Sequence, residues 1–329
     1  MVDPRSTGAE RPFGSDGREA QEKAVAKELA RRDRTLSVAT VRVHIDGGRP
    51  LFALPSPCLH RRRPRPNDPP QEVSKKMTDE PVRYECTGGL ARITLARSSR
   101  ANAVDLATAR AFDDAVERAG ADPQVRAVLV RGEGPRFCAG GDVAAMVAAT
   151  DRGQYLEELA GTLDLALQHL AALPVPVVAA VQGAVAGAGL ALMLSCDVIV
   201  SAASTKFLMA YADVGLTPDC GVSSLLPRAI GQVRALEMAL MGRTLTAAEA
   251  HEWGLITEVV DDDMLEARMA QIGERLEAGP TYALAQAKRL LRSSWQTPRE
   301  QLGQEEAQVI ADAVTRPEAT VLLAPFSKR

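Results

Sequence analysis

Two glycines, Gly187 and Gly189, stand where an apolar run could turn from a strand into a helix. Glycine has no Cβ, so it adopts positive φ and lets a ligand approach the backbone closely. The first N–H groups of a helix lack partners within that helix and lie at its positive end. Such groups can bind an oxyanion, the charge that develops on a carbonyl oxygen in acyl chemistry. The alternative is that these small residues only allow the helix to pack tightly.

Asp219 offers a second kind of chemistry, because a carboxylate can accept a proton and return it. It stands shortly before a helical pattern that begins near Gly221, and an aspartate in that place is also a common helix cap. Asp213 is a second carboxylate nearby, which we interpret as structural. The four histidines do not have the spacing of metal ligands, so we expect no metal site.

The two glycines belong to a stretch, residues 173–201, that is apolar for nearly its whole length. This length would suffice for a transmembrane helix, but prolines and glycines interrupt it and no basic flank or aromatic belt frames it. We therefore predict buried strands and a buried helix instead of a membrane span. The predicted elements are a strand over 175–181, a turn over 183–189, a helix over 190–196 and a strand over 198–201.

Strands and helices alternate from Met77 onward, which predicts an α/β layered fold. Before the apolar stretch we expect a hairpin around Gly88-Gly89, a helix over 105–119 capped by Asp105, a strand over 125–131 and a helix over 155–173. After it we expect a strand over 255–260, a capping box over 246–249, and helices over 221–230, 233–241, 247–252, 264–278, 282–294 and from Arg299.

Residues 1–76 differ in composition from the rest of the chain. They carry 16 basic and 10 acidic side chains and nine of the 20 prolines, a composition that cannot build a packed core. We expect a disordered basic and proline-rich extension, with a helix over 21–32 and a strand over 36–45. The alternative is a targeting or nucleic-acid-binding tail. The first 30 residues lack the apolar core of a secretory signal.

The remaining residues carry 23 basic and 32 acidic side chains, so the expected folded body is acidic. An acidic body argues against nucleic acid as its main ligand. The five cysteines are odd in number and form no C-x-x-C pair, so neither a disulfide framework nor a zinc ribbon is expected. Reduced thiols fit the cytoplasm, which we expect as the location.

Four motifs, taken in order, resemble the crotonase superfamily, the family of enoyl-CoA hydratases and isomerases. They are Arg100-Ala101-Asn102-Ala103, Phe137 to Asp142, Gly187-Ala188-Gly189 before Ser195-Cys196-Asp197, and His251-Glu252-Trp253-Gly254-Leu255. The resemblance runs from about Val82 to the C-terminus. It implies an acyl-CoA substrate, a spiral core of ββα turns over 77–265, and a helical part over 266–329 that forms homotrimers, often paired as hexamers. Coenzyme A enters as part of the substrate, so no separate cofactor is implied.

The same resemblance implies a role for individual residues. The thioester carbonyl becomes an enolate, whose oxygen would accept hydrogen bonds from the backbone N–H groups of Ala139 and Ala188. The two glutamates with which hydratases handle water would fall at Ala191 and Tyr211, so both carboxylates are missing here. Alanine cannot move a proton, and a tyrosine with an ordinary pKa of about 10 is a poor base at neutral pH.

Asp219 decides which reaction we expect. The run from Val214 to Gly221, followed by Leu225-Leu226-Pro227-Arg228, resembles ring-epoxide isomerases that act on phenylacetyl-CoA derivatives. In those enzymes and in Δ3,Δ2-enoyl-CoA isomerases an acidic residue at this place moves the proton, which implies an isomerase that uses Asp219. Two alternatives stay open: a hydratase that uses Asp219 with a bound water, and a non-catalytic homologue that binds acyl-CoA or RNA.

Substrate contacts are implied for a further set of residues. Arg100, Ala101, Gly140, Gly141 and Asp142 lie where the family contacts the nucleotide portion of coenzyme A, and Tyr211 is also expected to bind substrate. Arg100 would suit a phosphate. The alternative for Arg100 is an exposed arginine without a role.

Overall fold

A computed structural model of the chain describes residues 43–46, 49–52 and 80–326. The chain divides after Ser74 into two units, and each is described by itself. In the first unit, β1 (Val43–Asp46) and β2 (Arg49–Phe52) pair as an antiparallel hairpin. The helix expected over 21–32 and most of the strand expected over 36–45 lie outside the described residues.

The second unit is built on two sheets. Their strands are β3 (Val82–Thr87), β4 (Leu90–Leu95), β5 (Ala127–Gly132), β6 (Val177–Val181), β7 (Ala184–Ala186), β8 (Val198–Ala202), β9 (Lys206–Leu208), β10 (Leu245–Thr246) and β11 (Glu258–Val260). The larger sheet has the order β11–β8–β6–β5–β4–β3 and is parallel except for the β3–β4 hairpin. In the smaller sheet β7 is parallel to β9, and β9 is antiparallel to β10.

Strand β6 is apolar throughout because both faces of the sheet are covered. Val177 belongs to the core on one face, together with α2 (Leu106–Ala121) and α4 (Arg152–Ala172). Its neighbour Val178 belongs to a second core on the other face, against α9 (Leu265–Glu277). A strand that is buried on both faces has a continuous run of apolar residues in its sequence. In the described part of the chain, no helix combines the length and apolar character that crossing a membrane requires.

The apolar stretch folds into the predicted succession of strand, helix and strand, with two differences. Its helix, α5 (Ala188–Leu194), begins two residues earlier than expected, directly at the turn. The segment expected to be only a turn contains β7, which pairs with β9, a strand that was not expected. The partner of β7 lies in a distant part of the chain, so no local pattern could show this pairing.

The other helices cover the sheets and form the C-terminal part. They are α3 (Val143–Ala148), α6 (Val222–Ile230), α7 (Gln232–Met241), α8 (Ala247–Glu252), α10 (Thr281–Ser293), α11 (Arg299–Val314) and α12 (Pro317–Leu323), with short 3₁₀ turns η1 (Ser98–Arg100), η2 (Ala212–Val214), η3 (Asp262–Met264) and η4 (Ala324–Phe326). The predicted caps are confirmed: Asp105 accepts the Thr108 N–H at the start of α2, and Thr246 and Glu249 form the complete capping box of α8.

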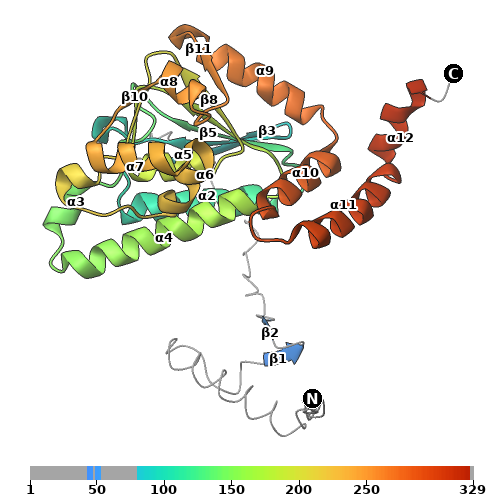
Figure 1. The fold of residues 1–329 in the computed structure, drawn as a ribbon, viewed down its shortest axis with the longest axis horizontal. Helices are drawn as coiled ribbons and strands as arrows, with labels where there is room; N and C mark the ends of the chain where they lie inside the picture. The colour runs from blue at the N-terminus through green and yellow to red at the C-terminus, as the bar shows by residue number, and fades with distance from the viewer. Residues whose placement is uncertain (1–42, 47–48, 53–79, 327–329) are drawn as a thin grey trace, which may run out of the picture. The chain divides into compact units, whose positions relative to one another are not determined.

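Helix α9 belongs to the core, because Leu265 and Met269 are buried against the sheet. The boundary expected at residue 266 falls inside this helix, so the C-terminal helical part begins after α9. Helices α11 and α12 contain no buried residue and extend from the body (Figure 1).

Helix α10 is held to the core by Asp197. The carboxylate accepts the Val177 N–H at 2.8 Å and binds Lys288 Nζ at 2.9 Å and Arg292 Nη2 at 2.7 Å. Lys288 also donates to the Val175 carbonyl at 2.9 Å, and its side chain is only 7% exposed. Burial lowers the pKa of Lys288, although Asp197 opposes this effect.

Replacing Lys288 by methionine should lower the free energy of unfolding by about 1.5–3 kcal/mol, the usual value of a hydrogen bond to a charged group. Urea denaturation of the wild type and of Lys288→Met measures this difference. Lys206→Met is the control, because Lys206 is exposed and its side chain has no partner among the described residues; we expect a change within about 0.5 kcal/mol. Equal stability of all three proteins would contradict the role of Lys288.

Candidate active site

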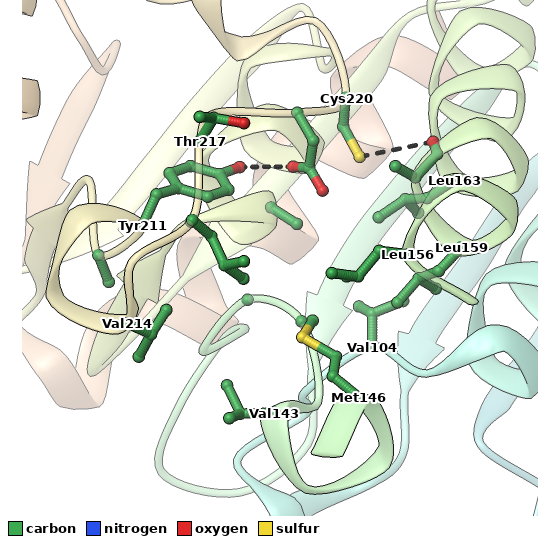
Figure 2. Close-up of a pocket in the computed structure, with 18 of the residues that line it drawn as sticks. Val104, Val143, Met146, Leu156, Leu159, Leu163, Tyr211, Val214, Thr217 and Cys220 are labelled. Carbon is green, nitrogen blue, oxygen red and sulfur yellow. Dashed lines mark hydrogen bonds between the residues drawn. The ribbon is translucent and has the colours of Figure 1, made fainter. Parts of the chain in front are cut away.

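A cavity of about 410 Å³ lies between α4, the turns that precede α3 and α5, and the segment that precedes α6 (Figure 2). Its wall is mostly aliphatic. The aliphatic side chains that line it are Val104, Val143, Met146, Leu156, Leu159, Leu163, Val214 and Leu216. A few polar side chains join them, namely Glu157, Tyr211, Thr217 and Asp219. A cavity of this size and composition is typical of a site for a small organic group.

The turn at Gly187 and the loop that precedes α3 lie in close contact. Gly187 has a φ of 52°, a value that favours glycine, and α5 begins at the next residue. A Cβ at Gly189 would lie 2.5 Å from the Cys138 carbonyl oxygen, so no larger residue fits there without separating the two segments. The Ala186 N–H donates to the same carbonyl at 3.0 Å. Gly189 therefore serves the close packing, whereas Gly187 allows the positive φ of the turn and lines the cavity.

The expectation for Ala139 needs a correction. Its N–H donates to the Ala101 carbonyl at 3.1 Å, so this group is already used. Two residues further on, the Gly141 N–H has no acceptor within the described part of the chain, although Gly141 lines the cavity. The Ala188 N–H, at the first position of α5, likewise has no acceptor among the described residues. The N–H groups of Gly141 and Ala188 are thus two cavity-wall donors for which the described residues offer no acceptor.

Asp219 does not cap α6. The N-cap residue of that helix is Gly221, and no side chain caps it. The Asp219 carboxylate instead accepts a hydrogen bond from the Tyr211 hydroxyl at 2.7 Å (Figure 2). Cys220, between Asp219 and Gly221 in the chain, has a φ of 51°, a region that non-glycine residues rarely adopt. Backbone strain of this kind is frequent at functional sites.

Tyr211 lines the cavity but cannot act as a base at neutral pH. Its side chain is buried, with 9% of the residue exposed. Burial raises the pKa of Tyr211 far above its usual range, and the adjacent Asp219 carboxylate raises it further. The phenol therefore keeps its proton and uses it in the hydrogen bond to Asp219. The other position at which a hydratase glutamate would fall, Ala191, is fully buried in α5.

Glu157 is a carboxylate in the cavity wall that the sequence did not indicate. It lies on the exposed side of α4, and Leu156 and Ala160 beside it also line the cavity. The periodicity of the sequence predicted helix α4 but could not show which residues lie opposite Glu157. The opposite wall of the cavity comes from residues 210–220, which are distant in sequence.

The thiols around the site are neutral. Burial raises the pKa of Cys138 to about 11 and that of Cys196 to about 12, and it also raises the pKa of Cys220. A thiolate nucleophile is therefore not formed here at neutral pH. The Cys220 thiol donates towards the Ala160 carbonyl of α4 at 3.8 Å (Figure 2).

The residues expected to bind substrate divide into two groups. Gly140, Gly141 and Tyr211 line the cavity, whereas Arg100, Ala101 and Asp142 lie outside its lining. Arg100 is exposed at the end of η1. Ala101 adopts a φ of 53° and its carbonyl accepts the Ala139 N–H.

Asp142 is buried and holds the loop together. It caps α3 by accepting the Ala145 N–H at 3.2 Å, and its other oxygen lies 2.9 Å from Arg97 Nη2. Burial favours the protonated carboxyl, but the Ala145 N–H and the Arg97 guanidinium outweigh it and lower the pKa of Asp142 below its ordinary value. The geometry thus gives Asp142 a structural role.

Possible metal ligands lie away from the cavity lining. Asp113, Glu117 and His169 are grouped between α2 and α4. His169 Nδ1 lies 2.8 Å from Asp113 Oδ1, a contact that an ordinary hydrogen bond explains.

Fold and cavity together define a class: α/β proteins in which free backbone N–H groups and a carboxylate share an apolar cavity, an arrangement suited to an enolate. The model of the enoyl-CoA hydratase/isomerase family matches residues 85–319. The chain therefore belongs to the enoyl-CoA hydratase/isomerase family and has the crotonase fold predicted from its sequence.

Relatives of the chain differ in the reactions for which they are named. The 1,2-epoxyphenylacetyl-CoA isomerase of Escherichia coli (strain K12) is 38% identical over 211 residues, which are 63% of this chain and 79% of the relative. The 4-chlorobenzoyl coenzyme A dehalogenase-2 of Arthrobacter sp. is 30% identical and covers 77% of this chain and 92% of its own. The crystal structure of an enoyl-CoA hydratase from Bacillus anthracis has a TM-score of 0.71 and 26% identity, and covers 75% of this chain and 96% of its own.

Asp142→Asn should lower the free energy of unfolding by about 1.5 kcal/mol at pH 7, because asparagine still caps α3 but loses the ion pair with Arg97. The folded-state pKa of Asp142 lies below its ordinary value of 3.8, so the ionised carboxylate stabilises the fold above that pH. This stabilisation disappears as the pH falls through the lowered pKa. Urea denaturation at several pH values should therefore show the difference between variant and wild type narrowing below about pH 4.

The control for this experiment is Asp151→Asn. Asp151 caps α4 by accepting the Gln154 N–H and has no ion pair within the described ranges. Its substitution should change stability by no more than about 0.5 kcal/mol. An Asp142→Asn difference that does not depend on pH would contradict the ion-pair explanation.

Proposed function

We propose that this member of the family is an acyl-CoA isomerase in which Asp219 carries the proton. The observation that supports this most is the position of the Asp219 side chain: it lies in an apolar cavity, bonded to Tyr211, and does not cap α6. The N–H groups of Gly141 and Ala188, which are free within the described chain, lie in the wall of the same cavity.

The proposed reaction proceeds through a thioester enolate. The Asp219 carboxylate removes a proton from the carbon next to the thioester carbonyl, and the C–H electron pair moves into the enolate. The carbonyl oxygen gains negative charge and accepts hydrogen bonds from Gly141 and Ala188, each worth about 10²–10³ in rate. The Asp219 carboxyl then returns the proton two carbons further along the acyl chain, and the double bond shifts. No water is consumed.

A second candidate, an enoyl-CoA hydratase, is favoured by one observation. Glu157 is a second carboxylate in the cavity wall besides Asp219, and two carboxylates could hold and deprotonate a water. Against it, the glutamate positions of hydratases are occupied by the buried Ala191 and by Tyr211, whose hydroxyl is bound to Asp219. We therefore place the isomerase first.

We also propose that the chain is a cytoplasmic homotrimer or a pair of trimers. The C-terminal segment from α10 to η4 exposes large apolar side chains, including Leu291, Trp295, Ile310, Val321 and Phe326. Apolar surface of this extent favours association with other copies. The cysteines within the described residues are all free thiols, as expected for the cytoplasm.

Asp219→Asn should reduce the single-turnover rate of isomerisation of a 3-enoyl-CoA by about 10²–10⁴-fold, because the amide keeps the shape but cannot take the proton. Acyl-CoA binding and the melting temperature should change little. Asp213→Asn is the matched control, since Asp213 is exposed and outside the cavity lining. A near-normal rate for Asp219→Asn would refute the role of Asp219.

The same assay, repeated with crotonyl-CoA, separates the two candidate functions. An isomerase moves the double bond of the 3-enoyl-CoA and hydrates crotonyl-CoA slowly or not at all. Rapid hydration of crotonyl-CoA without double-bond migration in the 3-enoyl-CoA would establish the hydratase instead.

Light scattering of the purified chain at micromolar concentration should give three or six times the monomer mass of 35.1 kDa. Truncation after α9, at residue 278, should convert the protein to monomers, because it removes the exposed apolar helices. A monomeric mass for the full chain would contradict the proposed assembly.

A further inference from the structure

Tyr211 touches both parts of the proposed site. Its hydroxyl donates to Asp219 Oδ1 at 2.7 Å (Figure 2). Its ring lies over the turn that begins α5, because a Cβ at Gly187 would lie 3.8 Å from Tyr211 Cζ. The phenol thus connects the carboxylate to the turn that presents the Ala188 N–H.

The backbone around Tyr211 is held firmly. The Tyr211 N–H donates to the Met209 carbonyl at 2.6 Å, and the Tyr211 carbonyl accepts the N–H groups of Val214 and Leu216 at 3.2 and 3.0 Å. These hydrogen bonds fix the backbone conformation at the start of the segment that leads to Asp219. Because the backbone is fixed and the ring is buried, the Tyr211 hydroxyl is held in one position.

The hydrogen bond from Tyr211 gives the two oxygens of the Asp219 carboxylate different roles. Oδ1 is occupied by the phenol, which keeps its proton because burial and Asp219 raise the pKa of Tyr211. Oδ2 accepts no hydrogen bond from the phenol and can exchange a proton with the substrate; the Cys220 thiol is the other side chain hydrogen-bonded to this carboxylate. A donor to the ionised carboxylate also stabilises the form that acts as a base.

We infer that Tyr211 is a positioning residue: its hydroxyl fixes the Asp219 carboxylate relative to the Gly187 turn and leaves Oδ2 as the oxygen that moves the proton. This inference rests on the proposed role of Asp219. Besides Tyr211, the titratable groups around this carboxylate within the described chain are Cys220 beside it and Glu157 and Asp164 of α4.

The test uses Tyr211→Phe, which keeps the ring and removes the hydroxyl. We expect kcat for the 3-enoyl-CoA to fall about 10–10²-fold, since a misplaced catalytic group typically costs this much, while KM changes less than about threefold. The acidic limb of the kcat/KM profile should move to higher pH, because a carboxylate without its donor holds a proton more tightly. Tyr155→Phe is the control, since Tyr155 is partly buried on α4 but outside the cavity lining.

A double-mutant cycle separates this inference from the proposed function. The readout is deuterium uptake by the α-carbon of phenylacetyl-CoA in D₂O, which requires enolate formation but no isomerisation. Deuterium uptake by the Asp219→Asn variant tests the proposed function alone, and we expect this uptake to be lost. Given that loss, Tyr211→Phe should slow uptake in the wild-type background and have no further effect in the Asp219→Asn background. Equal effects in both backgrounds would show a merely structural tyrosine and overturn the inference.

A second substitution keeps the test valid if Tyr211→Phe does not fold. 3-Fluorotyrosine introduced at residue 211 keeps the phenol and makes it a stronger donor. The acidic limb should then move to lower pH, opposite to the shift expected for phenylalanine. A profile unchanged from that of the wild type, in either variant that folds, would overturn the inference.

Discussion

The site depends on the close contact between the turn at Gly187 and the loop that precedes α3. No side chain separates them at Gly189, where a Cβ would lie 2.5 Å from the Cys138 carbonyl oxygen. The short parallel bridge between Cys138 and Val185 holds the contact. As a consequence, two N–H groups from distant parts of the chain, those of Gly141 and Ala188, lie in the wall of one cavity. Residues that carry the proposed chemistry are thus positioned by backbone packing.

Several polar groups near the cavity are satisfied within the protein. The Ala139 N–H is bonded to the Ala101 carbonyl, and Asp142 is bonded to Arg97 and to the start of α3. Buried polar groups with partners make a loop rigid. Rigidity of these loops keeps the remaining free groups in place, which is what stabilising a developing charge requires, because preorganised donors need no rearrangement during the reaction.

The fold by itself does not decide the reaction. Proteins named as an isomerase, a dehalogenase and a hydratase share this fold with the chain at 26–38% identity. A common oxyanion site can serve several reactions if the proton-carrying side chains differ. In this chain the carboxylates that line the cavity are Asp219 and Glu157, while alanine and a protonated tyrosine occupy the two glutamate positions of hydratases.

The sequence by itself determined the α/β alternation, the family, the buried apolar stretch and the caps at Asp105 and Thr246, because periodicity, capping and motifs are local properties of the chain. It also indicated Asp219 but left helix capping open, and it named Ala139 as a donor. Only the tertiary structure decided these points, since the partners of Asp219 and Ala139 are Tyr211 and Ala101, which no local pattern assigns to them. The same reason explains why Glu157 and β7 were missed: their surroundings come from segments that are distant in sequence and meet only when the chain folds.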